Sequence, residues 1–223
     1  VHTAGPYSGE APDVLAAAIG AGVPVYTDLS DPVEYLREAR SLGPRAAERG
    51  TLALCAAGAF PGLSNVLAME CAHRLGRQRV RDLDFSYFTA GLGGSGEVNL
   101  YITNEGFGEP INRFRDGAAV AEVDGGSGRR RVDFFLTDSD PSAALVGSRS
   151  VWNWPFPEGL TVAEQLAVCG DSSVGMGTAP DLWNTVMGGM VGVVPRGWWK
   201  SAAFSRGLAA FSRPLVAVTD AFV

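Results

Sequence analysis

Cysteine and histidine are scarce in this chain of 223 residues. The cysteines are Cys55, Cys71 and Cys169, an odd number without C-x-x-C spacing. This pattern favours buried thiols in a reducing compartment over a disulfide framework or a zinc site. With only His2 and His73 present, a histidine-rich metal centre is excluded, and a Ser-His-Asp triad would depend on one of these two residues. The G-x-S-x-G signature is also missing, which disfavours a hydrolase.

Long hydrophobic runs are absent as well. No stretch reaches the roughly 18 consecutive apolar residues that predict a transmembrane helix. The nearest candidate, Leu182–Trp199, is interrupted by Asn184, by glycines and by Pro195. We therefore expect a helix in the core or at an interface, and the alternative is a peripheral membrane contact through Trp198 and Trp199.

The chain has no excess of positive charge. Its 18 lysines and arginines are outnumbered by 24 acidic residues, which gives a net charge of −6. Binding to a phosphate backbone requires a basic face, so nucleic acid is not expected as a partner. The one basic run, Arg129–Arg131, follows the glycine-rich segment 125–128. We expect it at a hairpin tip, either as a solvated loop or as a contact for an anion or partner.

A repeated strand-to-helix pattern marks the first 75 residues. The segments 1–7, 22–28 and 51–56 each read as a strand that breaks into a loop of small residues before a helix. Three such steps are typical of a doubly wound parallel sheet, in which ligands bind beyond the carboxyl ends of the strands. The sequence therefore predicts an α/β fold with a ligand site at one edge of the sheet.

Local signals predict where two of the helices begin and which face the second one buries. Asp31 has the residue type of an N-cap before a helix, and Ser64 is the expected cap of a helix that ends at Leu75. Leu67, Cys71 and Leu75 are spaced four apart. We expect these three side chains to form one buried stripe.

Strand patterns dominate from about residue 79 onward. Strands are expected over 83–89, 98–103 and 132–136. Asp116-Gly117 lies between residues suited to strands, which is a strong signal for a β-hairpin turn. Antiparallel strands after a βαβ half indicate a second, α+β domain with a mixed or antiparallel sheet.

Two glycine-rich loops differ in their context. Residues 91–96 match G-x-G-x-x-G, but a strand pattern follows them. A phosphate-binding turn requires a helix at that point, so we expect a structural loop, and phosphate binding is the alternative. The loop Gly58–Asn65 instead follows a strand and leads into a helix. Together with the loops 3–7 and 28–31 it is expected to line the carboxyl edge of the sheet, although each loop could also be an ordinary turn.

These loops carry a resemblance to a known family. The segments HTAGPY (2–7), AGVPVYTDLSD (21–31) and GAFPGLSN (58–65) resemble the saccharopine dehydrogenase-like oxidoreductases. The later segments 87–96, 132–134, 177–180 and 183–184 are similar to the plant and cyanobacterial branch of that family. The resemblance covers nearly the whole chain in collinear order.

The resemblance implies an NAD(P)-dependent oxidoreductase with a small-molecule substrate that it does not identify. It implies that residues 1–78 are the C-terminal half of a Rossmann-type dinucleotide-binding domain and that residues 79–223 form the α+β domain for substrate binding or dimerisation. The expected cofactor is NADP or NAD. Its expected contacts fall on the three loops and are Thr3, Ala4, Gly5, Pro6, Tyr7, Asp28, Ser30, Gly58, Pro61 and Gly62.

Catalytic residues are not identified by the resemblance or by spacing. Acid–base candidates near the expected cleft are His2, Tyr7, Asp28 and Asp31, and each has an ordinary structural alternative, such as a helix cap or a packing residue. Hydride transfer to an imine needs little more than orientation and one proton donor, so a sparse site is compatible with this activity.

The chain also departs from the family pattern. Family members carry a first strand, a G-x-G-x-x-G turn and a first helix ahead of the segment with which this sequence begins. We therefore expect the sequence to be a fragment of a longer protein. The alternative function is that of a non-catalytic relative, a structural or binding subunit of a larger assembly.

The remaining expectations concern assembly and compartment. All five tryptophans fall in the last third of the chain, where core packing is the first interpretation and a partner surface the second. A homo-oligomer or a subunit of a larger complex is expected. The plant-like resemblance makes a plastid, besides the cytoplasm, an expected compartment.

Overall fold

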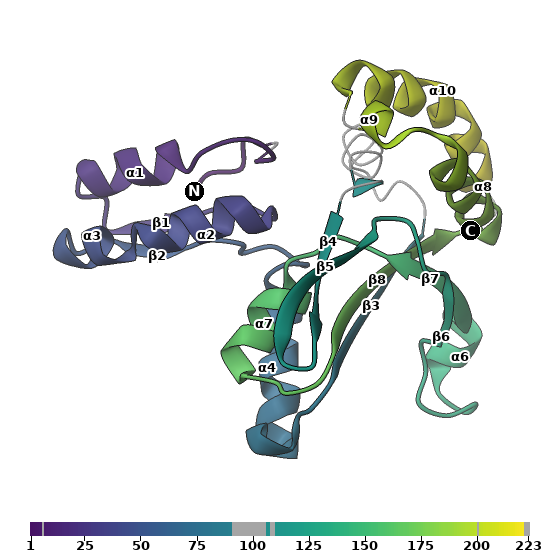
Figure 1. The fold of residues 1–223 in the computed structure, drawn as a ribbon, viewed down its shortest axis with the longest axis horizontal. Coiled ribbons are helices and arrows are strands. Elements are labelled where there is room, and N and C mark those ends of the chain that lie inside the picture. The colour runs from purple at the N-terminus through teal and green to yellow at the C-terminus, as the bar shows by residue number, and fades with distance from the viewer. Residues whose placement is uncertain (6, 91–105, 108–109, 200, 221–223) are drawn as a thin grey trace. The chain divides into compact units, whose positions relative to one another are not determined.

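A computed structural model describes residues 1–5, 7–90, 106–107, 110–199 and 201–220 (Figure 1). The chain divides into two compact units. Unit 1 comprises Val1–Arg81 and Phe156–Val168, and unit 2 comprises Asp82–Pro155 and Cys169–Val223. Residues 156–168 therefore pack with the first part of the chain, although the sequence placed them with the later part.

Unit 1 contains a small parallel sheet. Strand β1 (Val25–Thr27) pairs in parallel with β2 (Leu52–Leu54), and Val25 lies opposite Leu52. His2 forms a parallel bridge to Asp28, just beyond the end of β1. The βα steps expected from the sequence thus produce parallel pairing. The α/β class is confirmed, whereas a Rossmann-type sheet stays a prediction.

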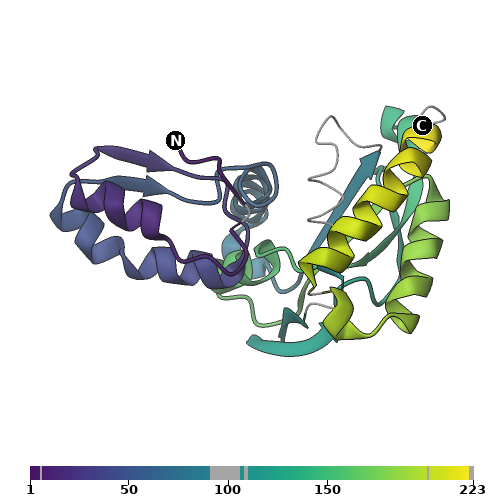
Figure 2. The ribbon, with the colours of Figure 1, turned by 90° about the horizontal axis from the view of Figure 1, so that it is seen from above.

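Helices α1 and α2 cover one side of this sheet. In sequence order the helices of unit 1 are α1 (Asp13–Gly20), α2 (Val33–Ser41), α3 (Gly43–Glu48), α4 (Leu63–Leu75), the short 3-10 helix η1 (Arg77–Arg79) and α7 (Glu158–Leu166). Figure 2 shows α1 and α2 on the same side of β1 and β2. The core between these helices and the sheet consists of Tyr7, Leu15, Ile19, Tyr26, Tyr35, Ala39 and Ala46.

Both predicted helix caps are wrong. Helix α2 begins at Val33, and its N-cap residue is Pro32, with extended backbone (ψ 134°), and not Asp31. Helix α4 begins at Leu63 with Gly62 as its N-cap, two residues earlier than a cap at Ser64 would place it. Ser64 lies inside the first turn of α4, and its hydroxyl donates to Glu158 Oε1 at 2.7 Å. The Ser64 hydroxyl thus bonds a distant carboxylate and does not act as the acceptor for a backbone amide that an N-cap would be.

The predicted buried stripe on α4 is also wrong. Leu67 and Leu75 are 56% and 63% exposed, and Cys71 is exposed. The helix buries Ser64 and Ala72 instead. Small side chains on this face allow α7 to pack closely against α4, which turns the larger side chains outward.

Unit 2 is built on a six-stranded sheet. Its strands are β3 (Leu83–Ala90), β4 (Pro110–Arg115), β5 (Ala118–Asp124), β6 (Arg130–Asp133), β7 (Ser148–Asn153) and β8 (Ser172–Ala179). Most pairs are antiparallel, in the order β5-β4-β8-β7-β6, but β3 runs parallel to β8 along its whole length. The sheet is therefore mixed. The expected strand 98–103 and the glycine loop 91–96 lie outside the described residues.

Four helices of unit 2 lie within the described part of the chain: α6 (Pro141–Leu145), α8 (Asp181–Val193), α9 (Arg196–Trp199) and α10 (Ala202–Asp220). Helix α8 packs against β7 and β8. Within the described residues, no helix is both long and apolar enough to cross a membrane.

The predicted hairpin is confirmed. Asp116 and Gly117 join β4 to β5 with φ angles of 47° and 78°. Two successive residues with positive φ are the geometry of a type I′ turn, which matches the twist of the flanking strands.

The arginine run does not lie at a hairpin tip. Arg130 begins β6, which pairs with β7 and not with the preceding strand β5. Its Nη2 donates to Asp84 Oδ1 on β3 at 2.5 Å. The guanidinium passes over Gly175 on β8, where a Cβ atom would lie 2.8 Å from it. The arginine thus crosses the sheet and forms an ion pair, because a glycine leaves room for it.

Candidate functional site

Three loops meet at the carboxyl edge of the parallel sheet in unit 1. They follow His2, β1 and β2, and they contain residues 3–7, 28–31 and 55–62. Because the strands are parallel, their carboxyl ends lie at the same edge. This is the location that the sequence predicts for a cofactor site.

Asp28 is the hydrogen-bonding centre of this edge. Its side chain is only 1% exposed. One carboxylate oxygen, Oδ1, accepts from the Ser30 hydroxyl at 2.6 Å, from the Ser30 amide at 3.1 Å and from the Ala56 amide at 3.0 Å. The other, Oδ2, accepts from the hydroxyls of Tyr26 at 3.1 Å and Tyr35 at 3.4 Å. A single carboxylate therefore fixes the second loop to the third.

The charge state of Asp28 follows from these contacts. Burial raises the pKa of the carboxyl group, but hydrogen bonds from Ser30, Ala56 and Tyr26 outweigh this effect, so the pKa of Asp28 lies below its usual value. Burial raises the pKa of Tyr26 far above its usual value. The pair is thus an ionised acceptor and a protonated donor at neutral pH.

Tyrosines attach the first loop to the same cluster. The Tyr26 hydroxyl lies 3.0 Å from His2 Nδ1, and the Tyr7 hydroxyl donates to the His2 carbonyl at 2.9 Å. The rings of Tyr7 and Tyr35 pack edge to face with centroids 5.2 Å apart. We call Asp28, Ser30, Tyr26, Tyr35 and His2 the Asp28 cluster, which joins all three loops.

Cys55 lies next to this cluster, and its surroundings keep the thiol protonated. Burial and the neighbouring Asp28 carboxylate raise the pKa of the Cys55 thiol to about 12. The thiolate, which is the nucleophilic form, is scarce at neutral pH. Cys55 is therefore a packing residue and not a nucleophile.

The third loop leads directly into α4 and uses its own backbone. The amides of Leu63 and Ser64 donate to the carbonyls of Gly58 and Ala59, both at 3.0 Å, and the Gly62 amide donates to Asn65 Oδ1 at 3.1 Å. The start of a helix can bind phosphate only through free amides. In α4 the loop already occupies the amides of Leu63 and Ser64.

Gly62 shows why this loop contains glycine. Its φ angle is 134°, and a Cβ atom there would lie 2.2 Å from the Gly58 carbonyl oxygen. Gly58 and Gly62 also form a backbone bridge. Gly62 is thus required by the shape of the loop, whatever the loop binds.

The predicted cofactor contacts differ in their exposure, and Gly58 and Gly62 are half-buried. Asp28 and Ser30 are buried, as are Tyr7 and Pro61, so their side chains hold the loops in place. Thr3, Ala4 and Gly5 are exposed and accessible to a ligand. Pro6 lies outside the described residues. That these loops bind a cofactor stays a prediction.

Several residues that hold these loops and α4 in place gave no signal in the sequence. Tyr26 and Tyr35 look like ordinary strand and helix residues, and the donor at Ala56 is a backbone amide 28 positions away from its acceptor. Glu158, buried in α7, is 94 positions away from Ser64. An aspartate at a strand end with tyrosines nearby is a weak indication of such a cluster, because buried carboxylates need donors.

Among the described residues, no three His, Cys, Asp or Glu side chains come together in a way that would hold a metal ion. What the edge offers is a rigid set of loops with small exposed residues at 3–5. Comparison with models of known protein families gave no match, and no curated protein matched the chain.

Proposed function

We propose that this protein is an NAD(P)-dependent oxidoreductase of the saccharopine dehydrogenase-like type, acting on a small-molecule substrate. The observation that supports this proposal best is the Asp28 cluster. It joins the first two segments on which the resemblance rests to each other and to Ala56, two residues ahead of the third segment, at the edge where sheets of this class bind their ligands.

The exposed loop 3–5 suits the nicotinamide half of a dinucleotide. Thr3, Ala4 and Gly5 have small side chains, so a flat ring can approach the backbone closely. The amides of Leu63 and Ser64 at the start of α4 are bonded to the loop 58–59, so these two amides supply no cradle for the pyrophosphate. When bound, NADP or NAD would supply or accept the hydride, and the residues of this edge would orient its ring.

Cofactor binding tests the proposal directly. We expect NADPH or NADH to bind the protein with a dissociation constant in the micromolar range by isothermal titration calorimetry. Calorimetry is preferred to tryptophan fluorescence because every tryptophan lies in unit 2. Absence of binding to either nucleotide by the folded protein would overturn the proposal.

A matched pair of variants locates the site. Ala4→Asp places a carboxylate on the exposed loop at the carboxyl edge, where it would repel the phosphates of a dinucleotide. Ala21→Asp places the same charge on an exposed residue after α1, ahead of the amino end of β1. We expect at least a tenfold loss of affinity in Ala4→Asp and less than a twofold change in Ala21→Asp. Equal effects would place the nucleotide elsewhere.

A specific observation favours the second candidate, a binding subunit of a larger assembly. Val25, Leu52 and Leu54 are 60%, 67% and 59% exposed on the sheet of unit 1. Exposed apolar side chains gathered on one face are typical of interaction surfaces. A folded protein that binds neither nucleotide would leave this function as the better candidate.

A further inference from the structure

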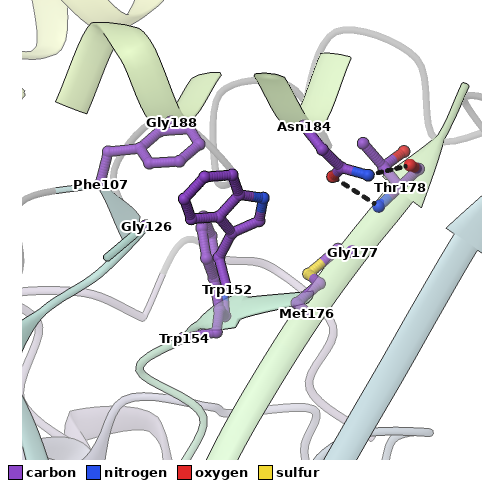
Figure 3. A pocket seen from close by; sticks show the side chains of 9 residues that line it. All are labelled: Phe107, Gly126, Trp152, Trp154, Met176, Gly177, Thr178, Asn184 and Gly188. Atoms are coloured by element: carbon purple, nitrogen blue, oxygen red, sulfur yellow. Dashed lines mark hydrogen bonds between the residues drawn. The ribbon is translucent and has the colours of Figure 1, made fainter. Parts of the chain in front are cut away.

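Unit 2 contains a pocket formed mainly by β7, β8 and α8 (Figure 3). It lies entirely within unit 2, so an inference about it is independent of the function proposed for unit 1. Its volume is about 40 Å³. The described residues that line it are Phe107, Gly126, Trp152, Trp154, Met176, Gly177, Thr178, Asn184 and Gly188.

Glycines give this pocket its aromatic wall. A Cβ atom at Gly188 on α8 would lie 2.2 Å from the Trp152 ring, so the indole packs directly against the helix backbone. In the same way a Cβ atom at Gly126 would lie 2.6 Å from the Phe107 ring. The rings of Phe107 and Trp154 pack edge to face with centroids 5.1 Å apart. The shape of the pocket thus depends on close ring-to-backbone packing.

A buried hydrogen-bond donor faces this pocket. Trp152 Nε1 is inaccessible to solvent and has no acceptor within the described part of the chain. Figure 3 shows this nitrogen turned toward Thr178 and Asn184. Leaving a buried donor without an acceptor costs about 1–3 kcal/mol. An acceptor that enters the pocket would recover this free energy.

The polar atoms of the Asn184 side chain already have partners on Thr178 and Asp181. Its Oδ1 accepts from the Thr178 amide at 3.1 Å, and its Nδ2 donates to the Thr178 carbonyl at 2.7 Å and to Asp181 Oδ1 at 3.0 Å. Both amide hydrogens are therefore used, which fixes the side chain in this orientation.

The Thr178 hydroxyl is more weakly bound. Its contact with the Ala179 carbonyl is 3.5 Å long, beyond the usual length of an O–H···O hydrogen bond. This hydroxyl can turn toward the pocket, where it would add a second donor beside Trp152 Nε1. None of the described lining residues carries a charge.

We propose that this pocket binds a small, uncharged molecule that carries a carbonyl oxygen. The oxygen accepts a hydrogen bond from Trp152 Nε1, and the apolar part of the molecule packs against Phe107, Trp154 and Met176. The volume exceeds the roughly 10–15 Å³ that one water needs and is well below the roughly 150 Å³ of a cavity that holds benzene. The occupant is therefore a ketone of a few heavy atoms or the carbonyl end of a longer molecule.

Acetone and isobutene form a matched pair of probes, because the two molecules share a shape and only acetone has an acceptor. We would titrate each into the ¹⁵N-labelled protein and follow the indole N–H resonance of Trp152, assigned by its loss in Trp152→Phe. We expect a saturable shift with acetone at millimolar concentration and at least tenfold weaker binding of isobutene. Absence of saturation with acetone would mean that the pocket holds water only, and would overturn the proposal.

Variants then test the roles of the two donors. The methyl resonance of Met176 reports binding in all of them. Trp152→Phe keeps an aromatic ring but removes the donor, so the preference for acetone over isobutene should disappear. Thr178→Val removes the second donor and should weaken acetone binding about two- to fivefold. Trp198→Phe, at an exposed position outside the pocket, is the control and should bind both probes as the unmodified protein does.

Two outcomes among these variants would contradict the proposal. A Trp152→Phe protein that still prefers acetone would show that Trp152 Nε1 is not the donor. Should this variant fail to fold, the titrations of the unmodified protein and of Thr178→Val decide the question, and equal affinities for acetone and isobutene would refute it.

Discussion

Two buried polar groups, one in each unit, differ in how their hydrogen bonds are satisfied. In unit 1 the Asp28 carboxylate is almost fully buried, and donors from Ser30, Ala56, Tyr26 and Tyr35 surround it. In unit 2 Trp152 Nε1 is buried in an aromatic pocket, without an acceptor in the described part of the chain. A satisfied polar cluster fixes loops in one arrangement, whereas an unsatisfied donor favours an incoming acceptor. We therefore assign a structural role to the buried Asp28 carboxylate and a ligand-binding role to the buried Trp152 Nε1.

Removal of the Asp28 carboxylate should have the largest effect. Asp28→Ala leaves the buried donors of Ser30, Ala56 and the two tyrosines without their acceptor. We expect unit 1 to lose about 3 kcal/mol or more of stability, measured by hydrogen exchange of residues 1–81 with mass spectrometry. Asp13→Ala at an exposed site is the control. Comparable exchange in the two variants would contradict a structural role for the cluster.

Acid should affect unit 1 through the same carboxylate. Because the folded-state pKa of Asp28 lies below the ordinary value of 3.8, its contribution to stability is fully present above pH 3.8 and is lost as the pH falls through the folded-state pKa. We expect the exchange protection of unit 1 to fall in this acid range. The same acid dependence in Asp28→Asn would show that another group is responsible.

The ion pair across the sheet of unit 2 should have a smaller effect. Gly175→Ala would place a Cβ atom against the Arg130 guanidinium and separate it from Asp84. We expect a loss of no more than about 1 kcal/mol, because the arginine end is flexible and the ion pair is partly exposed, measured by urea denaturation with tryptophan fluorescence, which reports on unit 2. In an Arg130→Ala background the same substitution should cost clearly less. Additive effects of the two substitutions would rule out the proposed contact.

Thiol modification should have the smallest effect, a difference in reaction rate between exposed and half-buried cysteines. Cys71 and Cys169 are exposed, whereas Cys55 is half-buried, and its thiol has a pKa of about 12. At pH 8 we expect iodoacetamide to modify Cys71 and Cys169 at least tenfold faster than Cys55, as measured by peptide mass spectrometry. In denaturant all three rates should converge. Fast modification of Cys55 in the folded protein would mean that the Asp28 cluster opens readily.

Local patterns predicted some elements correctly. The Asp116-Gly117 turn is confirmed because its residues need positive φ, which aspartate and glycine adopt within the turn itself. The βα steps of the first 75 residues are confirmed as parallel pairing of β1 with β2. The predicted stripe on α4 failed because helical spacing shows which residues share a face and not which face is buried.

The sequence by itself determined the α/β class, the turn chemistry and the position of the loops that follow the parallel strands. Only the tertiary structure decided that Asp28 anchors those loops, that Ser64 reaches Glu158 and that β3 lies parallel to β8. It also brought Phe107, Trp152 and Gly188 together around one pocket. The physical reason is the distance along the sequence over which each kind of interaction acts. Capping, turns and periodicity act over a few residues, whereas these contacts join positions far apart in the sequence and form only when whole elements pack together.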